Sequence, residues 1–513
     1  MKFKMLLSKN FNFDNKIIFL LIIFIISRIL YYELFNIKFD YWTINIYWQF
    51  VPQNLLKNEF IESIIFNHWQ APFLNILLGI LMKITNEYLI LIKILYLFIG
   101  FFSFVLIYLI AKNFDLSEKN SFITSTILML LPTTILYENH FYKEYLTFFF
   151  LLSVFYSSLK IYKNFHSIKY ILYFSFSLSL LCLTRETFHI FWGYILICVI
   201  QKKLIIKNKI LLFLIFTLIT MPFYLKNLIL FNKFAINTTS MYEHLSQKID
   251  YVKEMDDPNR HEKIRNFTFG SYKNYIDFKK KTSILYDVPI NSSASYYQEI
   301  LDYEYKRENS LLKSNTLFNE VYFEVDKYRK KDFYLVIKEY PTLLLVNILN
   351  SLTRHLFASS DYFNFTKHNA DKMKFMIKLS DCIKLTPVCI YDYGFEWKKR
   401  TIDGDEYFSV DTGPLNYKEK IIYSLQYTNF LLVIIYIFLL IEFFRLIIFK
   451  QNRSNNKLII FWLLTFIFIF LALVVFEDGE IARHRFPFDY LSFLIFLRQI
   501  NLRFFNKSHN NPN

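Results

Sequence analysis

The sequence predicts an all-α polytopic membrane protein with about ten transmembrane helices, amphipathic surface helices and one large extracytoplasmic, mainly helical loop domain. Hydrophobic residues make up 54% of the 513 residues, and 60 Phe stand against only 8 Gly. The apolar residues gather in blocks of the length that a helix needs to cross a bilayer. Lys and Arg gather in the connectors between these blocks. This composition excludes a disordered chain, a collagen and a small disulfide-rich domain.

The first span is expected at residues 17–34. It follows a lysine-containing N-terminal stretch, is longer than a signal-peptide core, and is not followed by a small-residue cleavage site. We therefore expect an uncleaved span with a cytoplasmic N-terminus. Nine further spans are expected at 88–111, 121–137, 145–161, 170–184, 188–201, 210–226, 422–447, 458–476 and 487–500.

The charged connectors support this arrangement. With the N-terminus inside, the connectors that fall in the cytoplasm are 112–119, 160–169, 202–209, 445–457 and the C-terminal tail. All are short and rich in Lys and Arg, as the positive-inside rule requires. The same placement explains the net charge of +16, so we expect membrane lipids and no nucleic acid as partners.

The outer side then holds a first outer loop, 37–87, and a longer polar segment, 228–420, whose length suits a small folded domain. Few Gly and Pro interrupt the longer segment, which favours helix. Its Cys382 and Cys389 either form a disulfide in an oxidising compartment or remain two free thiols. The predicted organisation is a transmembrane core at 1–227, an extracytoplasmic domain at 228–420, and C-terminal transmembrane helices with a cytoplasmic tail at 421–513.

Three shorter segments are expected to form helices at the outer surface. Residues 41–60 mix Trp and Tyr with Asn and Gln, a pattern that favours the headgroup region. Residues 71–84 are too short to span comfortably. Residues 341–357 carry a polar stripe along one helical face. A spanning helix there would reverse the positive-inside pattern of everything downstream.

Ionisable and polar side chains gather at the outer ends of the spans. Carboxylates suit a general base or a metal ion, and Arg and Lys suit a phosphate. Any one of these residues is more simply an ordinary interfacial group, but the set taken together favours a site. The set includes Asp40, His68, Gln70, Glu138, Asn139, His140, Lys143, Glu144, Arg185, Glu186, His189, Lys226, Asn227, Arg483, His484 and Arg485.

Several short motifs follow one another in a family-like order. Asp40 follows the first span, and His68-Trp69-Gln70-Ala71-Pro72 opens a surface helix. This loop resembles the first outer loop of bacterial GT-C class membrane glycosyltransferases, relatives of the protein O-mannosyltransferases and of lipid A aminoarabinose transferase. Ala71 stands where that class has the first of two prolines, and its paired acidic motif is reduced to Asp40. The later motifs that resemble one branch are Tyr137-Glu138-Asn139, Arg185 with His189, Lys226-Asn227, and Arg483-His484-Arg485-Phe486-Pro487.

The resemblance implies transfer of a hexosyl or pentosyl group from a polyprenyl-phosphate-linked donor. The acceptor would be an envelope glycan, lipid or protein at the outer face of the cytoplasmic membrane. Asp40 would deprotonate the acceptor hydroxyl or hold a divalent metal ion, and Glu138 and Glu144 are the further catalytic candidates. The candidates for substrate and donor binding are His68, Gln70, Asn75, Arg185, His189, Lys226, Arg483 and Arg485.

Three other functions remain open. One is a structural or scaffold membrane protein, which would not need acidic and basic groups gathered at one level. An O-antigen or polysaccharide polymerase also has about ten spans and a large outer loop, but it would need Arg-rich outer loops around a pyrophosphate. A lipid-linked sugar transporter or flippase is often built from inverted repeats and broken helices. The sequence has no internal repeat, and we expect no charged pair deep in a span. The absence of a phosphate-binding loop argues against an ATP-driven pump.

The topology can be tested with reporter fusions. Fusions at about Asn208 and Asn452 should read cytoplasmic, and fusions near Asn291 and Asp403 should read external, because short basic connectors stay inside. A cytoplasmic signal from the 228–420 segment would contradict both the topology and an outward-facing site.

Overall fold

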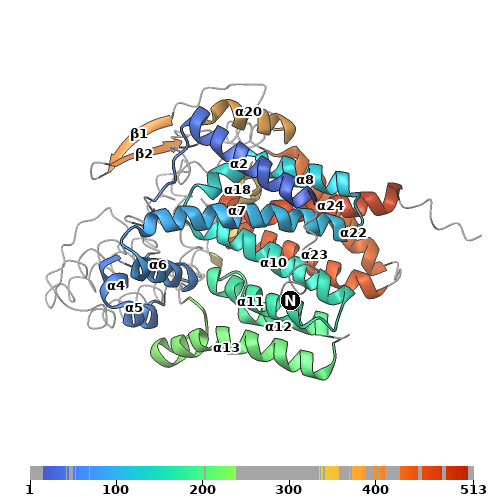
Figure 1. Cartoon of the computed structure of the whole chain (residues 1–513), viewed down its shortest axis with the longest axis horizontal. Helices are drawn as coiled ribbons and strands as arrows, with labels where there is room; N and C mark the ends of the chain where they lie inside the picture. The colour runs from blue at the N-terminus through green and yellow to red at the C-terminus, as the bar shows by residue number, and fades with distance from the viewer. Residues whose placement is uncertain are drawn as a thin grey trace, which may run out of the picture.

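The computed structural model describes residues 15–41, 43–44, 50–51, 53–68, 70–201, 204–237, 334, 337–338, 341–356, 369, 372–386, 397–402, 405–410, 428–448, 453–476 and 481–505. Its regular elements are helices except for one hairpin, in which β1 (Trp397–Ile402) pairs antiparallel with β2 (Asp405–Val410) (Figure 1). The all-α prediction is wrong for this hairpin. Most of the predicted extracytoplasmic domain lies outside the described residues, so its mainly helical character stays a prediction.

Every predicted span falls on a helix or on a bent pair of helices. The N-terminal ones are α2 (Asn15–Phe35), α7 (Tyr88–Asn113), α8 (Glu118–Leu130), α9 (Pro132–Glu138), α10 (Lys143–Lys163), α11 (Ile168–Thr184), α12 (Ile190–Ile200) and α13 (Ile206–Phe231). The C-terminal ones are α22 (Phe430–Ile448), α23 (Arg453–Phe476) and α24 (Ile481–Ile500), which a short π-helix, η5 (Asn501–Phe505), follows.

Six of the described helices are long and apolar enough to cross a membrane: α2, α7, α10, α13, α22 and α23. The number is seven if α8 and α9 form one broken span. The chain is therefore a polytopic helical membrane protein, but the predicted ten spans are not confirmed. With 11 residues, α12 measures only about 17 Å, against a hydrocarbon core of about 30 Å. Charged side chains within α24 lower its hydropathy.

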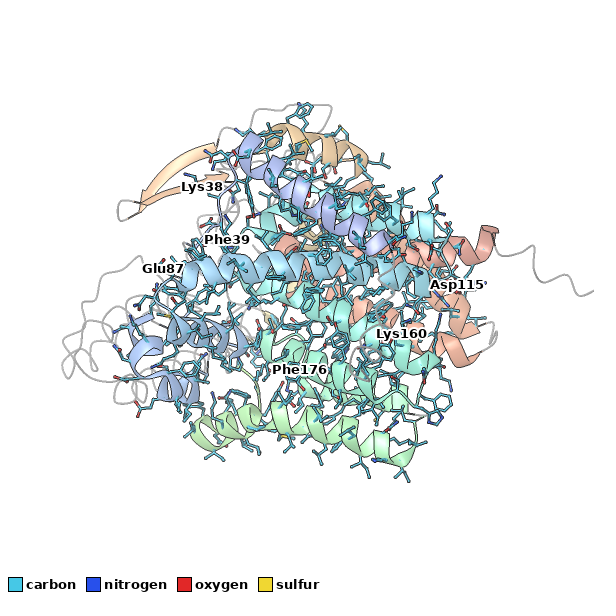
Figure 2. The ribbon with its side chains drawn as sticks, in the orientation of Figure 1. Lys38, Phe39, Glu87, Asp115, Lys160 and Phe176 are labelled. Atoms are coloured by element: carbon cyan, nitrogen blue, oxygen red, sulfur yellow. The ribbon has the colours of Figure 1, made fainter. Side chains whose placement is uncertain are left out.

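The connectors sort to the two ends of the bundle. Lys38, Phe39 and Glu87 lie at one end, and Asp115 and Lys160 lie at the other (Figure 2). At the second end, Lys163 Nζ donates to the carbonyl of Asn113 over 3.1 Å. The first two connectors predicted to be cytoplasmic, 112–119 and 160–169, therefore lie together, which is the alternation expected of successive crossings.

The described part of the predicted first outer loop includes α4 (Gln53–Asn58), α5 (Phe60–Phe66) and α6 (Phe73–Ile84), at the end where α7 begins (Figure 1). The predicted surface helix at 71–84 is α6. The predicted surface helix at 41–60 lies partly outside the described residues, and its described part includes α4.

In the described part of the long polar segment lie α18 (Pro341–His355) and α20 (Lys374–Ile383). Ser351 and His355, both on the predicted polar stripe of α18, are buried, because α18 packs against α23 and α24. These two polar residues therefore face the bundle. The position of this helix at the outer surface stays a prediction.

The centre of the bundle is α10, which packs against α7, α11 and α24. Aromatic side chains fill the space around it. Phe486 of α24 stacks on Tyr137 of α9, with ring centroids 4.1 Å apart, and contacts Phe148 of α10. These contacts fix the start of α24 against the turn between α9 and α10.

The predicted span at 121–137 is broken in two by Pro132, where α8 and α9 meet at 62°. Leu131 is extended there, with ψ at 135°, because a proline disfavours the helical conformation of the residue before it. Pro132 itself takes the first position of α9, where a missing N–H costs nothing. The bend carries the end of α9 towards α2.

Candidate functional site

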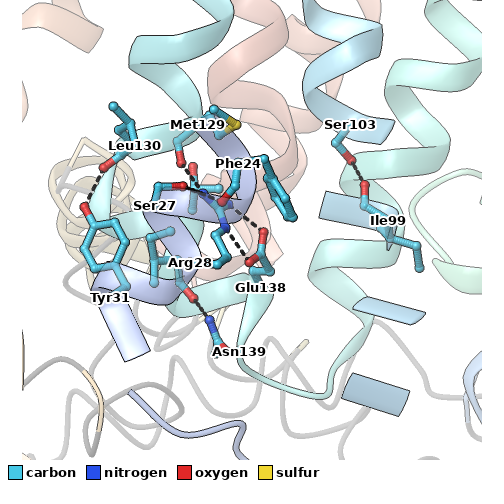
Figure 3. A network of polar contacts seen from close by, with 12 residues as sticks. Phe24, Ser27, Arg28, Tyr31, Ile99, Ser103, Met129, Leu130, Glu138 and Asn139 are labelled. Carbon is cyan, nitrogen blue, oxygen red and sulfur yellow. Dashed lines mark hydrogen bonds and ion pairs between the residues drawn. The ribbon is translucent and has the colours of Figure 1, made fainter. Parts of the chain in front are cut away.

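A buried ion pair joins the first span to the end of α9. Arg28 of α2 donates from Nε to Glu138 Oε1 over 2.8 Å and from Nη2 to Glu138 Oε2 over 2.7 Å (Figure 3). Tyr145 of α10 donates to the same Oε2 over 2.9 Å. Both charged side chains are buried, at 4% and 1% exposure. Glu138 is therefore held as an acceptor on two sides.

The turn after Glu138 is tied to the chain that leaves α2. Tyr32 donates its hydroxyl to Asn139 Oδ1 over 2.9 Å. Asp40 then pairs with His140 as an isolated parallel bridge, in which the Asp40 amide donates to the Asn139 carbonyl over 2.8 Å. The Phe141 amide returns a 3.1 Å bond to the Asp40 carbonyl. The backbone on both sides of the Asp40 side chain is thereby fixed.

The side chains of Asp40 and His140 face each other. Asp40 Oδ2 lies 3.9 Å from His140 Nδ1. His140 is buried at 2% exposure, whereas Asp40 keeps 19% of its side chain exposed. Asp40 is therefore a fixed carboxylate that a molecule from outside can reach.

Lys143, at the start of α10, joins two other segments to this turn. Its Nζ lies 3.1 Å from Glu186 Oε1 and 3.3 Å from Gln70 Oε1. Burial alone would raise the pKa of Glu186. The positive charges of Lys143 and Arg185 outweigh this effect and lower the pKa to about 2. The Glu186 carboxylate is consequently charged over the whole neutral range.

A second buried pair lies beside Lys143. Arg185, at the end of α11, places Nη1 3.4 Å from Glu144 Oε1, and both side chains are 1% exposed. Nη2 of Arg185 is buried and has no hydrogen-bond partner among the described residues. We call Asp40, Gln70, His140, Lys143, Glu144, Arg185 and Glu186 the polar cluster.

Three of the predicted binding residues lie together elsewhere, around the end of α13. Lys226 donates to the backbone carbonyls of Asn67 and Ile64, where α5 ends. His68 is buried against Phe231, with ring centroids 4.4 Å apart. These contacts pack the loop that contains α5 against α13. Lys226 thus binds the C-terminal end of α5, where the helix dipole favours a cation.

The third residue of this group, His189, precedes α12 and accepts from the amide of Phe191 over 3.3 Å, so it caps that helix. Its ring also contacts Tyr224 of α13. Burial lowers the pKa of His189 below its ordinary value, which favours the neutral ring.

The remaining candidates lie apart from the polar cluster. Asn75 is buried and accepts from the Val51 amide over 3.0 Å, which fixes the loop before α4. Arg485 is buried, donates to Asp489 Oδ1 over 2.8 Å, and also bonds to the carbonyl of His355. Arg483 belongs to α24, but its side chain lies outside the described part of the chain. Of eleven predicted site residues, the polar cluster holds Asp40, Gln70, Glu144 and Arg185, and Glu138 adjoins it through the turn.

We expected no charged pair deep in a span and did not predict the buried pair between Arg28, inside the first span, and Glu138, at the end of α9. The signal was in the sequence: Arg28 is a single charge inside the apolar run of the first span, and such residues need a partner. His140, Lys143 and Glu186 were recognised as polar groups at outer ends but were not assigned to the site. Their link to Asp40 and Gln70 depends on tertiary contacts that spacing does not reveal.

A metal ion at Asp40 stays a prediction. Within the described ranges, no three His, Cys, Asp or Glu side chains are arranged to hold a metal ion. Asp40 and His140 alone offer two donor atoms. We therefore derive no step through a metal.

Comparisons with known proteins give one structural similarity. No protein-family model matches the chain, and no curated protein matches it. Among solved structures, it is similar to the crystal structure of an oligosaccharyltransferase from Archaeoglobus fulgidus tethered with an acceptor peptide containing the NVT sequon via a disulfide bond. The two are 12% identical, with a TM-score of 0.35, and the match covers 94% of this chain and 50% of the other. The chain thus spans about half the length of that protein, and at this level the similarity carries no conclusion about activity.

The low pKa of Glu186 predicts a loss of stability in acid. Its carboxylate favours the folded state above its ordinary pKa of 4.5, and this contribution is lost as the pH falls from 4.5 towards about 2. Thermal unfolding of the purified protein should therefore shift downwards over this window, and less so in Glu186→Gln. The matched control is Glu87→Gln at an exposed position. An identical acid response in Glu186→Gln and wild type would contradict the charged network.

Proposed function

We propose that the chain is a membrane glycosyltransferase. It would move a sugar from a polyprenyl-phosphate-linked donor to an envelope glycan, lipid or protein acceptor at the outer face of the cytoplasmic membrane. The observation that carries the proposal is the polar cluster at one end of the helix bundle, in which the reachable carboxylate of Asp40 pairs with His140, three residues before the buried cation Lys143. A base and cations at the end of a membrane bundle suit a donor whose lipid tail stays in the bilayer.

In the proposed reaction, Asp40 takes the proton from an acceptor hydroxyl. The hydroxyl oxygen forms a bond to the anomeric carbon of the sugar, and the bond from that carbon to the phosphate oxygen breaks. The phosphate leaves with the electron pair as an anion. His140, 3.9 Å from Asp40, is placed to orient the carboxylate and to receive a hydrogen bond or share the proton.

Arg185 and Lys143 are the cations that we assign to the leaving phosphate. Fixed donors stabilise charge that develops during a reaction, and they do so best in a site that excludes water. Arg185 is held by Glu144, yet its Nη2 has no hydrogen-bond partner among the described residues, so it retains a donor for an anion. Lys143 is held between Gln70 and Glu186.

Glu138 and Glu144 were candidate catalytic residues, and we assign them supporting roles instead. Each is buried in an ion pair with an arginine, Glu138 with Arg28 and Glu144 with Arg185. Of these three carboxylates Asp40 is the most exposed, at 19% against 1% for Glu138 and for Glu144.

The disulfide of Cys382 supports the outward orientation. Cys382 of α20 is disulfide-bonded, whereas Cys182 and Cys198 are free. Cys389, its predicted partner, lies outside the described residues. Disulfides persist in oxidising compartments, so this one favours an extracytoplasmic position for α20.

The function can be tested by mass spectrometry of envelope glycans and glycoproteins from cells that lack the gene. Wild type should restore the missing sugar. Glu33→Gln is the control and should restore it too, because Glu33 is an exposed carboxylate near the end of α2. Asp40→Asn should restore at least about a hundredfold less of this sugar than wild type, because the substitution keeps the size of the side chain but removes the base.

Full restoration by Asp40→Asn would contradict the proposed base. An unchanged glycan profile in cells without the gene would contradict the proposed activity. A shortened polymer with intact repeating units would identify a polymerase instead.

A further inference from the structure

The short stretch of chain that carries Asp40 is held by a segment far away in the sequence. We call residues 36–40, which lead from the end of α2 to Asp40, the strap. The strap begins at Asn36, whose φ of 49° is left-handed and ends the helix. At its other end, Asp40 is bonded to the turn between α9 and α10. Lys38 lies between these two points.

Asn369, which precedes α20, pairs with both backbone groups of Lys38. The Lys38 amide donates to Asn369 Oδ1 over 3.1 Å, and Asn369 Nδ2 donates to the Lys38 carbonyl over 2.7 Å. A side-chain amide carries a donor and an acceptor side by side, so it can bond to a backbone as a neighbouring strand does. Asn369 is only 3% exposed, so water is largely excluded from these two bonds.

The start of α20 makes further contacts with the strap. Lys372 Nζ donates to the Asn36 carbonyl over 2.7 Å. An apolar cluster joins this segment to α2, the strap and α9. Its buried members are Tyr31, Ile37, Ile135, Leu136, Met373 and Ile377. In Figure 1, α20 accordingly lies beside the end of α2. These contacts hold Asn369 in place against Lys38.

The strap is thus held on two sides, by the turn after α9 at Asp40 and by Asn369 at Lys38. Only one residue separates Lys38 from Asp40, so a shift of the chain at Lys38 is carried directly to Asp40. A general base must lie within hydrogen-bond reach of the proton that it takes. A displacement of about 1 Å can cost about a hundredfold in rate.

We propose that Asn369 is a positioning residue for Asp40. It fixes the strap so that the Asp40 carboxylate stays beside His140, where the acceptor hydroxyl is deprotonated. The inference rests on the proposed role of Asp40 as the base, whereas the hold of Asn369 on the strap can be tested without it. Through Asn369, the predicted extracytoplasmic domain takes part in the site.

The hold on the strap is tested by amide hydrogen exchange in the purified full chain. Asn369→Leu keeps the approximate size of the side chain but removes both bonds. The amides of Lys38 and Asp40 should therefore exchange at least about tenfold faster than in wild type, while α13 keeps its protection. Asn369→Ser is a milder variant, since its short hydroxyl replaces at most one of the two bonds, and it should change exchange in the same direction.

Phe375→Ala is the matched control, because Phe375 lies on α20 and is 75% exposed. It should leave both amides unchanged. Wild-type exchange at Asp40 in Asn369→Leu and in Asn369→Ser would overturn the proposal.

The effect on transfer is measured as the sugar restored to cells that lack the gene, at equal abundance of each variant in the membrane. Asn369→Leu should restore at least about tenfold less sugar than wild type, and Phe375→Ala as much as wild type. In an Asp40→Asn background, Asn369→Leu should cause no further loss, because it acts through Asp40. A further loss of the same size in that background would overturn the positioning role.

The two measurements separate this proposal from the proposed function. Full restoration by Asn369→Leu, together with a loss in Asp40→Asn, would overturn the positioning role and leave Asp40 as the base. Full restoration by Asp40→Asn would contradict the base and the positioning role together. Faster exchange in Asn369→Leu, with a loss of transfer that depends on Asp40, supports both.

Discussion

The buried pair of Arg28 and Glu138 is the interaction on which the site depends. Taking two charges out of water costs several kcal/mol per ion, so such a pair persists only with good geometry and further hydrogen bonds. Here the contact is bidentate, Tyr145 adds a donor to Glu138, and Arg28 Nη1 also donates to Ser27 Oγ and the Met129 carbonyl. Removing one partner would leave a buried charge without compensation, at a cost of about 3–5 kcal/mol.

The neighbouring sequence is adapted to this pair. A Cβ atom at Gly100 of α7 would lie only 2.3 Å from Glu138 Oε2, so this position admits the carboxylate because it has no side chain. Pro132 supplies the bend that turns α9 towards α2. From Glu138 the chain continues directly into the bridge between His140 and Asp40. The pair thus fixes the turn in which His140, two residues after Glu138, pairs with the partly exposed carboxylate of Asp40.

The sequence predicted the elements better than their arrangement. The apolar blocks of the sequence predicted every long helix of the described bundle, because a helix that crosses lipid needs a long run of apolar residues. The break at Pro132 was missed, since the surrounding residues are apolar throughout and only the proline marks it. The sequence also did not show that Ser351 and His355 of α18 are buried, because a polar stripe looks the same whether water or protein faces it. The short α12 shows that an apolar segment need not be a full span.

The candidate site was predictable in composition but not in pairing. Asp40, Gln70, Glu144 and Arg185 were singled out, and all four belong to the polar cluster. Lys226, His68 and Arg485 instead bind or pack against parts of the scaffold. An outer-end cation that binds a phosphate and one that binds a carbonyl have the same sequence signature. Only the contacts distinguish them.

The most direct test of this account is amide hydrogen exchange at Asp40 and Phe141, the two amides of the bridge, in Glu138→Gln. If the buried pair holds the bridge, both amides should exchange about tenfold faster or more than in wild type, while α13 keeps its protection. Glu118→Gln is the control, because Glu118 forms an exposed pair with Lys112 that is worth little. Unchanged exchange at Asp40 and Phe141 in Glu138→Gln would contradict the claim that this pair positions the site.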